Sequence, residues 1–393
     1  MASRIGILSV ERALGPSQYL HSLRNSVELP AIPYLGYVAT RCGIYDTTFA
    51  GAQAAMQRMG TNARDDISAI KVAWPNWVTD ETAGTNVMTI TASIEYPTGT
   101  FTQLKFGGSA TGIAQPGTNI YSEMTPIPGG IPNGDKFWVR FWRNSSNAYY
   151  VNNATLPNTS MGDALNLGGA DQTMGGTVVG NANGIITPCA ILGMTTKRSV
   201  VILGDSRQAG YRDDFQAANG GWGEFGTAFA GQYGYTNLGL SGHTAAQYVN
   251  AHALRDELVQ YASDVVNAYG VNDIFVNHST AAQLKALNAT IAGYYPTKRV
   301  YRATLDPETS STNNFIDLLN QTLRNGSDEA QRLLYNADVR NDAAYFDCAG
   351  VSESSLNSGK WRIDGTANKY TSDGIHPSPT LYRLYSFSLP AAA

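Results

Sequence analysis

The pattern of apolar and polar positions changes its period part-way along the chain. From about residue 35 to 195, short segments with apolar residues at every second position lie between turns rich in Gly, Pro, Asn and Thr. The clearest is NVMTITASIEY, in which every second residue from Met88 to Tyr96 is apolar. A period of two places alternate side chains on opposite faces of a half-buried strand. Many short strands without intervening helices predict an antiparallel β-sandwich or jelly roll.

A second segment, NGDKFWVRFWR, follows the same rule and carries two tryptophans. Phe137, Val139 and Phe141 share one face of the expected strand, while Trp138 and Trp142 share the other with an arginine. The paired tryptophans could stack on sugar rings. They could equally pack under a long loop or against the rest of the chain, because large aromatic side chains are usually mostly buried.

After about residue 196 expected strands alternate with expected helices. The strands are KRSVVILGD, YTNLGLSG, SDVVNAYG, KRVYRATL and AAYFDCAG; the helices are GWGEFGTAFAGQYG, TAAQYVNAHALRDELVQYA, TAAQLKALNATIAGYY, NNFIDLLNQTLRN and DEAQRLLYNA. Such alternation predicts a parallel sheet that is covered by helices on both faces. We therefore expect three parts: a leader over residues 1–34, a β-sandwich over 35–195 and an α/β domain over 196–393.

The leader contains one helical segment, SVERALGPSQYLHSLRN, which Gly15 and Pro16 interrupt. It could dock on the body of the chain or on an assembly partner. The apolar stretch before it is broken by Glu11 and Arg12, so no secretory signal is expected. The protein would then stay inside the cell, or leave it by another route and act outside the cell or on a virion.

Charge and composition exclude several classes of function. The 393 residues carry a formal net charge of −4, with no clustered Lys and Arg, so nucleic acid is not an expected partner. No apolar run approaches the roughly 18 residues that a membrane span requires. Cys42, Cys189 and Cys348 are too far apart for a CxxC site and are expected to be buried free thiols. The five histidines lack metal-ligand spacing, so neither a metal ion nor another cofactor is expected.

The candidate chemistry begins with a GDS turn directly after the first parallel strand. Strand-to-helix turns of α/β sheets present reactive groups, which makes Ser206 a candidate nucleophile, although such a serine is more often a helix cap. The segment SDGIHP supplies a base and an orienting carboxylate as His376 and Asp373. Taken alone, this second motif would be an Asp-capped turn with a surface histidine.

Two further strand ends offer donors for an oxyanion. The N–H of Gly242 is unobstructed by a side chain, and the amide of Asn272 provides two donors. Each is an ordinary turn when viewed alone. Together with Ser206, Asp373 and His376, they form four turns of suitable chemistry after strands of one predicted sheet, and the whole set predicts a serine hydrolase.

These residues resemble the four sequence blocks of the SGNH, or GDSL, hydrolases. The matching segments are LGDS at Ser206, GLSGHT at Gly242, GVND at Asn272 and DGIHP at Asp373 and His376. The resemblance covers about residues 197–390. It implies a flavodoxin-like α/β/α sandwich, ester hydrolysis, and an oxyanion hole from the N–H groups of Ser206 and Gly242 and the side chain of Asn272.

The chain also departs from the family pattern at the rim of the expected site. RQAGY follows GDS where an aliphatic residue and a hydroxyl are common, and His243 follows Gly242 where an acidic residue is common. His243 is the rival base, but its turn supplies no carboxylate, so a substrate contact is its expected role. The other candidate substrate contacts are Asp205, Arg207, Trp138 and Trp142.

The expected reaction is acyl transfer to water through an acyl-enzyme on Ser206. A shallow site at strand ends suits a small acyl group, and an appended β-rich module could hold a polysaccharide. We therefore expect an O-acetyl esterase that acts on a carbohydrate, for example in a phage particle that deacetylates a host glycan. The alternatives are a short-chain lipase or thioesterase, and a structural or receptor-binding protein whose hydrolase fold only binds glycan.

Overall fold

The computed structural model describes residues 32–45, 47–50, 54–78, 81–83, 86–145, 147–150, 157–181 and 184–390. The chain divides into two compact units, residues 1–34 and 35–393. The helical segment predicted in the leader, and its use as an assembly contact, lie outside the described residues. Within those residues, no helix has both the length and the apolar character that a membrane crossing requires.

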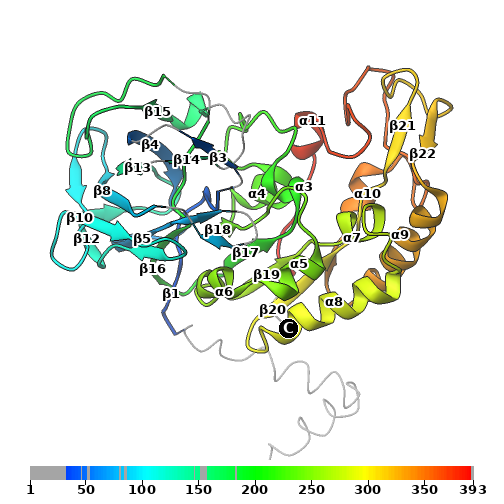
Figure 1. Ribbon diagram of the computed structural model, residues 1–393, viewed down its shortest axis with the longest axis horizontal. Coiled ribbons are helices and arrows are strands. Elements are labelled where there is room, and N and C mark those ends of the chain that lie inside the picture. The colour runs from blue at the N-terminus through cyan, green and yellow to red at the C-terminus, as the bar shows by residue number, and fades with distance from the viewer. Residues whose placement is uncertain are drawn as a thin grey trace, which may run out of the picture. The chain divides into compact units, whose positions relative to one another are not determined.

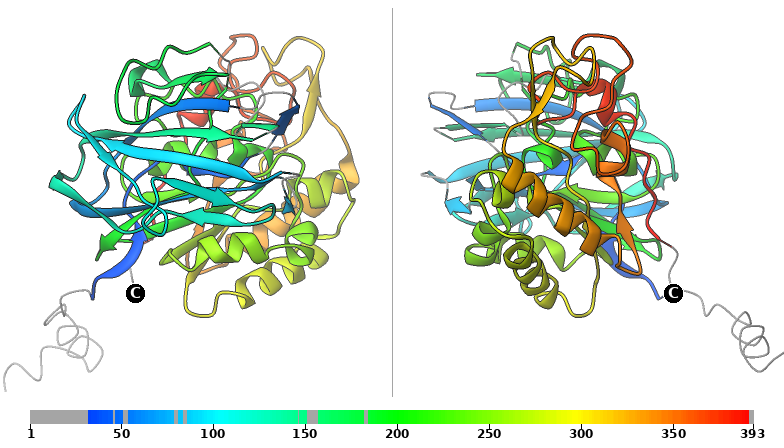
Figure 2. Two further views of the ribbon diagram at one scale, coloured as in Figure 1. Left: turned by 60° about the vertical axis from the view of Figure 1, so that its left-hand side comes forward. Right: turned by 90° about the vertical axis from the view of Figure 1, so that its right-hand side faces the viewer.

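Two antiparallel sheets form the β-rich part (Figures 1 and 2). In spatial order, the first contains β1 (Tyr34–Tyr37), β16 (Ala190–Thr195), β5 (Ile67–Pro75) and β11 (Asn119–Tyr121), and β12 (Thr125–Ile131) also pairs with β5. The second contains β10 (Thr111–Ala114), β8 (Met88–Glu95), β13 (Lys136–Asn144), β4 (Ala54–Asn62) and β15 (Ala164–Leu167), and β9 (Phe101–Gln103) pairs with β8. Smaller pairs are β3 (Thr47–Ala50) with β14 (Asn147–Tyr150) and β6 (Trp77–Val78) with β7 (Thr82–Ala83); one 3₁₀ turn, η1, covers Thr159–Met161.

The period of two along these strands fills the core between the sheets. Val72 and Trp74 of β5 meet Phe137, Val139 and Phe141 of β13 in one buried cluster. The antiparallel sandwich predicted for this part of the chain is confirmed.

The outer face of β8 is buried as well, which the alternation did not predict. Ser93 Oγ donates to the carbonyl of Thr173, and the Glu95 carboxylate pairs with Arg58 at 2.8 Å. The partner of Ser93 lies in a loop from a distant part of the sequence, and that of Glu95 lies on β4, so each buried polar group has a hydrogen bond.

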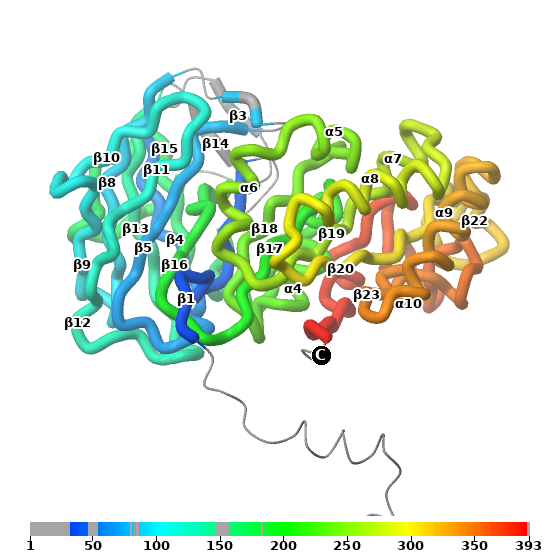
Figure 3. The backbone as a smooth tube through the Cα atoms, turned by 90° about the horizontal axis from the view of Figure 1, so that it is seen from below, coloured from blue at the N-terminus to red at the C-terminus, as the bar shows by residue number. Residues whose placement is uncertain are grey.

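The second half of the chain builds a six-stranded parallel sheet. Its spatial order is β2 (Cys42–Gly43), β18 (Gly234–Asn237), β17 (Ser199–Leu203), β19 (Asp264–Asn267), β20 (Arg299–Ala303) and β23 (Tyr345–Phe346). Figures 1 and 3 show β18, β17, β19 and β20 side by side in this order. Counted along the chain from β17, the five main strands have the order 2-1-3-4-5 of flavodoxin-like sheets.

Alternate residues of the buried strands pack into two hydrophobic cores, one on each face of the sheet. Val201 and Leu203 of β17 pack on one face with α5 (Ala245–Asn250), α6 (Ala253–Val259), α8 (Ala281–Gly293) and α9 (Gly326–Val339). Val200 and Ile202 pack on the other face with α4 (Gly223–Phe229), α10 (Cys348–Ser352) and α11 (Pro379–Tyr382). The predicted α/β/α sandwich is therefore confirmed. The short helices α3 (Ser206–Ala209) and α7 (Val271–Phe275) follow β17 and β19.

Three features of this half differ from the sequence-based expectation. First, β2 adds a sixth parallel strand from the N-terminal side, through the pairs Thr236 with Cys42 and Asn237 with Gly43. Two residues are too short a segment for a periodicity argument.

The three cysteines are buried free thiols, as predicted.

Second, the helix expected over residues 244–262 is interrupted between α5 and α6. Ala251 has an extended backbone, and a new helix begins after His252. The N–H groups of Leu254 and Arg255 donate to the carboxylate of Glu81, each at 2.9 Å. A side chain 173 residues earlier therefore caps α6, and no local pattern could reveal that.

Third, the helix expected over residues 313–325 is wrong. The segment belongs to an antiparallel hairpin of β21 (Thr309–Ser311) and β22 (Gln321–Leu323), with Asn314 and Phe315 at positive φ. Asp317 accepts hydrogen bonds from the backbone N–H and the side chain of Asn320. Short polar side chains here replace the hydrogen bonds that a helix would make, because they compete for the same backbone groups.

Candidate active site

Ser206 lies where the GDS turn leads from the buried strand β17 into α3. The side chain of Asp205 accepts a hydrogen bond from Arg207 N at 3.0 Å, and Gln208 Oε1 accepts one from Asp205 N at 3.0 Å. These two bonds form a capping box that fixes the backbone on either side of Ser206. Asp205 is buried, so its observed position is that of a turn-forming residue and not of a substrate contact.

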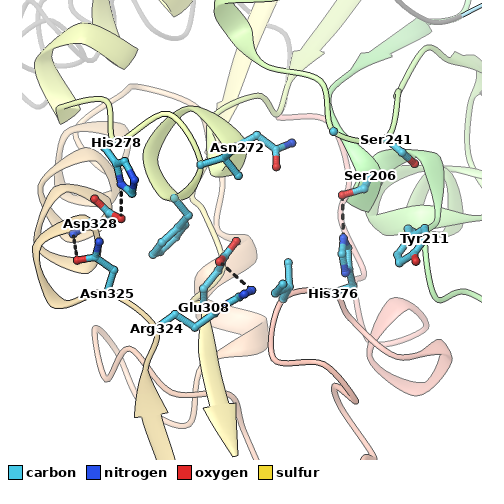
Figure 4. Close-up of a pocket in the computed structure, with 14 residues that line it drawn as sticks. Ser206, Tyr211, Ser241, Asn272, His278, Glu308, Arg324, Asn325, Asp328 and His376 are labelled. Atoms are coloured by element: carbon cyan, nitrogen blue, oxygen red, sulfur yellow. Dashed lines mark hydrogen bonds and ion pairs between the residues drawn. The ribbon is translucent and has the colours of Figure 1, made fainter.

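The structure brings Ser206, His376 and Asp373 into one hydrogen-bonded line. Ser206 Oγ lies 2.9 Å from His376 Nε2 (Figure 4), and His376 Nδ1 lies 2.9 Å from Asp373 Oδ2. The other oxygen of Asp373 accepts hydrogen bonds from the backbone N–H groups of Ile375 and His376. Partial burial opposes ionisation of Asp373, but the hydrogen bonds from His376 and the backbone outweigh it and hold its pKa below the usual value.

A glycine makes the tight turn between Asp373 and His376 possible. Gly374 has φ of 71°, and a Cβ there would lie 1.8 Å from the carbonyl oxygen of Thr309. Its own carbonyl accepts hydrogen bonds from Thr309 N and from Trp361 Nε1. The loop that carries His376 is therefore fixed to the β21 strand and to the buried core.

Arg207 connects the serine turn to the histidine loop. Its guanidinium donates twice to the carbonyl of Ile375, at 2.7 and 3.1 Å, and lies 3.7 Å from the carboxylate of Asp306. The Arg207 side chain is only 3% exposed. The structure thus gives Arg207 a positioning role in place of the expected substrate contact.

Gly242 and Asn272 border the same pocket as Ser206 and His376. Gly242 has φ of 76°, a conformation that favours glycine. Asn272 Nδ2 donates to the carbonyl of His243 at 2.9 Å, which orients the amide and uses one of its two N–H donors. Within the part of the chain that the structure describes, no other residue accepts from the second N–H of this amide.

His243 does not line this pocket, contrary to the expected substrate contact. It is 3% exposed, and its Nδ1 lies 3.1 Å from the hydroxyl of Tyr269 and 3.4 Å from Arg255. Burial, reinforced by the positive charge of Arg255, lowers the pKa of His243 to about 3. The imidazole is therefore neutral near neutral pH, and its contacts are structural.

The pocket has a volume of about 600 Å³ and contains several residues that the sequence did not single out. Among them, Glu308 and Arg324 stand opposite Ser206 in Figure 4. Glu308 lies five residues after the end of β20 and directly before β21, so no strand-end motif marks it in the sequence. Trp138 and Trp142 are not in the pocket; they belong to β13 and donate to the carbonyls of Met161 and Gly169.

The ionisation of Asp205 gives a testable pH dependence of stability. Burial raises the pKa of Asp205 to about 6, above its value in the unfolded chain. The contribution of Asp205 to the free energy of unfolding is therefore full below the unfolded pKa, and it is lost as the pH rises through the folded pKa. Asp205→Asn keeps the capping oxygen and removes the charge. Relative to wild type, we expect the variant to gain roughly 1 kcal/mol of unfolding free energy between pH 5 and pH 8.

Urea denaturation of both proteins at the two pH values measures this difference. Asp65→Asn, at a partly exposed surface carboxylate, is the control and should show no such change. A constant difference between Asp205→Asn and wild type would contradict the assignment.

The region that contains Ser206 and His376 was compared with known protein families. Residues 202–384 match the model of the GDSL-like lipase/acylhydrolase family. This part of the chain is a GDSL-like acylhydrolase domain. The family supports ester hydrolysis by this part of the chain.

Solved structures similar to the GDSL-like domain each cover 48% of the chain. A GDSL-like lipase from Bacteroides thetaiotaomicron is 18% identical, with 83% of its own chain covered and a TM-score of 0.33. A carbohydrate acetylesterase family member from Sinorhizobium meliloti is 15% identical, with 93% covered and a TM-score of 0.33. An acetyl-xylooligosaccharide esterase from Geobacillus has the same identity and TM-score, with 90% covered. A search of curated proteins found no match.

Proposed function

We propose that the GDSL-like domain is a serine esterase that removes O-acetyl groups from a carbohydrate. The observation that carries the proposal is the line from Ser206 Oγ through His376 to Asp373, with 2.9 Å at each of its two contacts. A hydroxyl, an imidazole and a carboxylate in this order are the parts of a nucleophile with its general base.

In the first half of the proposed reaction, Ser206 Oγ attacks the ester carbonyl carbon as His376 Nε2 takes its proton. Asp373 stabilises the resulting imidazolium through Nδ1. The carbonyl oxygen becomes an oxyanion that accepts hydrogen bonds from Ser206 N, Gly242 N and Asn272 Nδ2. When the C–O bond breaks, His376 returns its proton to the leaving alcohol and an acyl-serine remains.

In the second half, water replaces the alcohol. His376 takes a proton from the water as the water oxygen attacks the acyl carbon. The second tetrahedral intermediate uses the same donors, and its collapse breaks the bond to Ser206 Oγ. His376 then returns the proton to the serine, and the acid leaves.

The proposed substrate rests on the residues that line the pocket. The pocket offers polar side chains across from Ser206 that can bind the hydroxylated part of a sugar, and Phe275, Val276 and Ile375 line it as well. Two of the similar structures described above are named as carbohydrate or xylooligosaccharide acetylesterases.

The test is hydrolysis of p-nitrophenyl acetate by wild type and Ser206→Ala, followed by a panel of acetylated glycans scored by released acetate. Loss of hydrolysis in the variant supports an esterase. Equal rates for both proteins would favour the glycan-binding alternative. Release of longer fatty acids from p-nitrophenyl esters, in preference to acetate, would favour the lipase alternative.

The proposed oxyanion site predicts a specific loss for Asn272→Ala. Removing one oxyanion donor should lower kcat by about 10²- to 10³-fold, with a smaller change in KM, because the donor acts on charge that develops in the transition state. Steady-state kinetics with p-nitrophenyl acetate measures the effect. Asn277→Ala, an exposed asparagine just beyond α7, is the control. An unchanged kcat in Asn272→Ala would remove Asn272 from the mechanism.

A further inference from the structure

The pocket has two ends with different chemistry. One end holds Ser206, Gly242, Asn272 and His376, the residues of the proposed reaction. The other end is lined by a second polar group, which Figure 4 shows across the pocket: His278, Glu308, Arg324, Asn325 and Asp328. The proposed reaction gives this second group no role.

Three members of the second group already have partners within the protein. Asn325 Oδ1 accepts hydrogen bonds from Ser327 N and Asp328 N and so caps α9. The carboxylate of Asp328 lies 2.9 Å from His278 Nδ1. Their hydrogen-bonding capacity is therefore largely consumed inside the protein.

Glu308 and Arg324 differ, because their side chains keep hydrogen-bonding capacity for a ligand. Their closest ionic contact is with each other, at 3.6 Å, which is longer than a hydrogen bond. Among the described residues, no hydrogen bond of 3.5 Å or less links the Glu308 carboxylate to a partner. A backbone bond from Arg324 N to the Glu308 carbonyl, at 3.3 Å, keeps the two residues adjacent.

The environment of this pair has an energetic cost that a ligand could offset. The Glu308 side chain is only 8% exposed, whereas that of Arg324 is 45% exposed. Burial raises the pKa of Glu308 to about 7, although Arg207 and Arg324 oppose the rise. A buried carboxyl group that lacks short hydrogen bonds is unfavourable unless a partner enters the site.

The size of the pocket fits a ligand larger than an acetyl group. Its volume of about 600 Å³ lies within the range of sites that enclose small organic ligands. An acyl group bound at Ser206 leaves the remainder of the volume for the alcohol part of the ester, which then lies towards Glu308 and Arg324.

We propose that Glu308 and Arg324 form a sugar subsite that binds free hydroxyl groups of the carbohydrate carrying the ester. The inference rests on the proposed function and extends it to the alcohol side of the substrate. The Glu308 carboxyl group accepts hydrogen bonds from sugar hydroxyls, and the Arg324 guanidinium donates to their oxygens. Because an ester without a hydroxyl leaves these groups unpaired, the subsite selects partly acetylated sugars over apolar esters.

The test compares three substrates with the same acyl group. They are a methyl glycoside carrying a single O-acetyl group, the same glycoside with every hydroxyl acetylated, and p-nitrophenyl acetate. Glucosides, galactosides and xylosides are used in parallel, and released acetate or p-nitrophenol is measured. The variants are Glu308→Gln and Arg324→Gln, with Thr322→Ala as a control on the exposed side of the same hairpin.

For the best singly acetylated glycoside, we expect either glutamine variant to lower kcat/KM by about 10-fold, because a neutral amide replaces a charged partner of the sugar hydroxyls. The rates with the fully acetylated glycoside and with p-nitrophenyl acetate should change less than about threefold. Thr322→Ala should behave as wild type. An equal loss on all three substrates would show a structural role for the pair and overturn the proposal, as would unchanged rates on every glycoside.

A binding measurement separates this inference from the proposed function. Ser206→Ala and Ser206→Ala combined with Glu308→Gln are titrated with the singly acetylated glycosides and observed by ligand NMR. Weaker binding in the double variant supports the subsite even if wild type hydrolyses none of the esters, a result that would by itself refute the esterase. Equal binding by the two proteins would overturn the subsite while leaving the esterase intact.

Discussion

Replacing Ser206 by alanine is expected to lower kcat for p-nitrophenyl acetate by about 10⁴- to 10⁶-fold. The hydroxyl is the group that forms the proposed acyl-enzyme, and its removal leaves the proposed general base, His376 Nε2, without the oxygen that it would deprotonate. The oxyanion donors would still bind the ester, so a residual rate above that of water is expected. Steady-state kinetics, with a burst measurement for the acyl-enzyme, tests this.

Ser310→Ala is the matched control, because Ser310 is an exposed serine on β21 that contacts Thr322. It should keep the wild-type rate and the wild-type burst. Circular dichroism confirms that each variant is folded. A folded Ser206→Ala protein that still shows a burst would place the nucleophile elsewhere.

Replacing Arg207 by methionine is expected to lower the free energy of unfolding by about 3–5 kcal/mol. The change leaves the Asp306 carboxylate buried without its cation and removes both hydrogen bonds to the Ile375 carbonyl. Because Ile375 precedes His376, the histidine loop should also lose its position. Urea denaturation at pH 7 measures the stability, and kcat measures the second effect.

Arg212→Met, on the same turn, provides the comparison for stability. The Arg212 side chain is 51% exposed and lies 3.3 Å from Asp373, so its removal should cost less than about 1 kcal/mol. Similar losses of stability in both variants would show that burial of Arg207 does not matter to the fold.

The fold could be predicted from the sequence wherever a local pattern agreed with the environment. In β17 an unbroken apolar run matched a strand that is buried on both faces. In 313–325 the apolar residues suggested a helix, but Leu319 is exposed and Asp317 binds the local backbone. The periodicity of a short segment does not reveal which apolar residues will be covered, because the covering element lies elsewhere in the chain.

The residues of the candidate site could likewise be predicted from the sequence only in part. The sequence placed Ser206, Gly242, Asn272 and His376 at turns of one sheet, and the structure gathers them around one pocket. Local chemistry gave no means of separating these residues from Arg207, since polar residues beside a reactive turn can face either the ligand or the core. The sequence analysis missed Glu308, because its ion pair is with Arg324, which follows the second strand of the β21–β22 hairpin.

By itself, the sequence determined the alternation of strands and helices, the two kinds of sheet and the candidate reactive side chains, since these depend on local period and residue chemistry. Only the tertiary structure decided which polar groups are buried, which loops lie over which strands, and which charges face each other. Those outcomes depend on contacts between residues far apart in the chain, and desolvation and hydrogen bonding act on them only once the chain has folded.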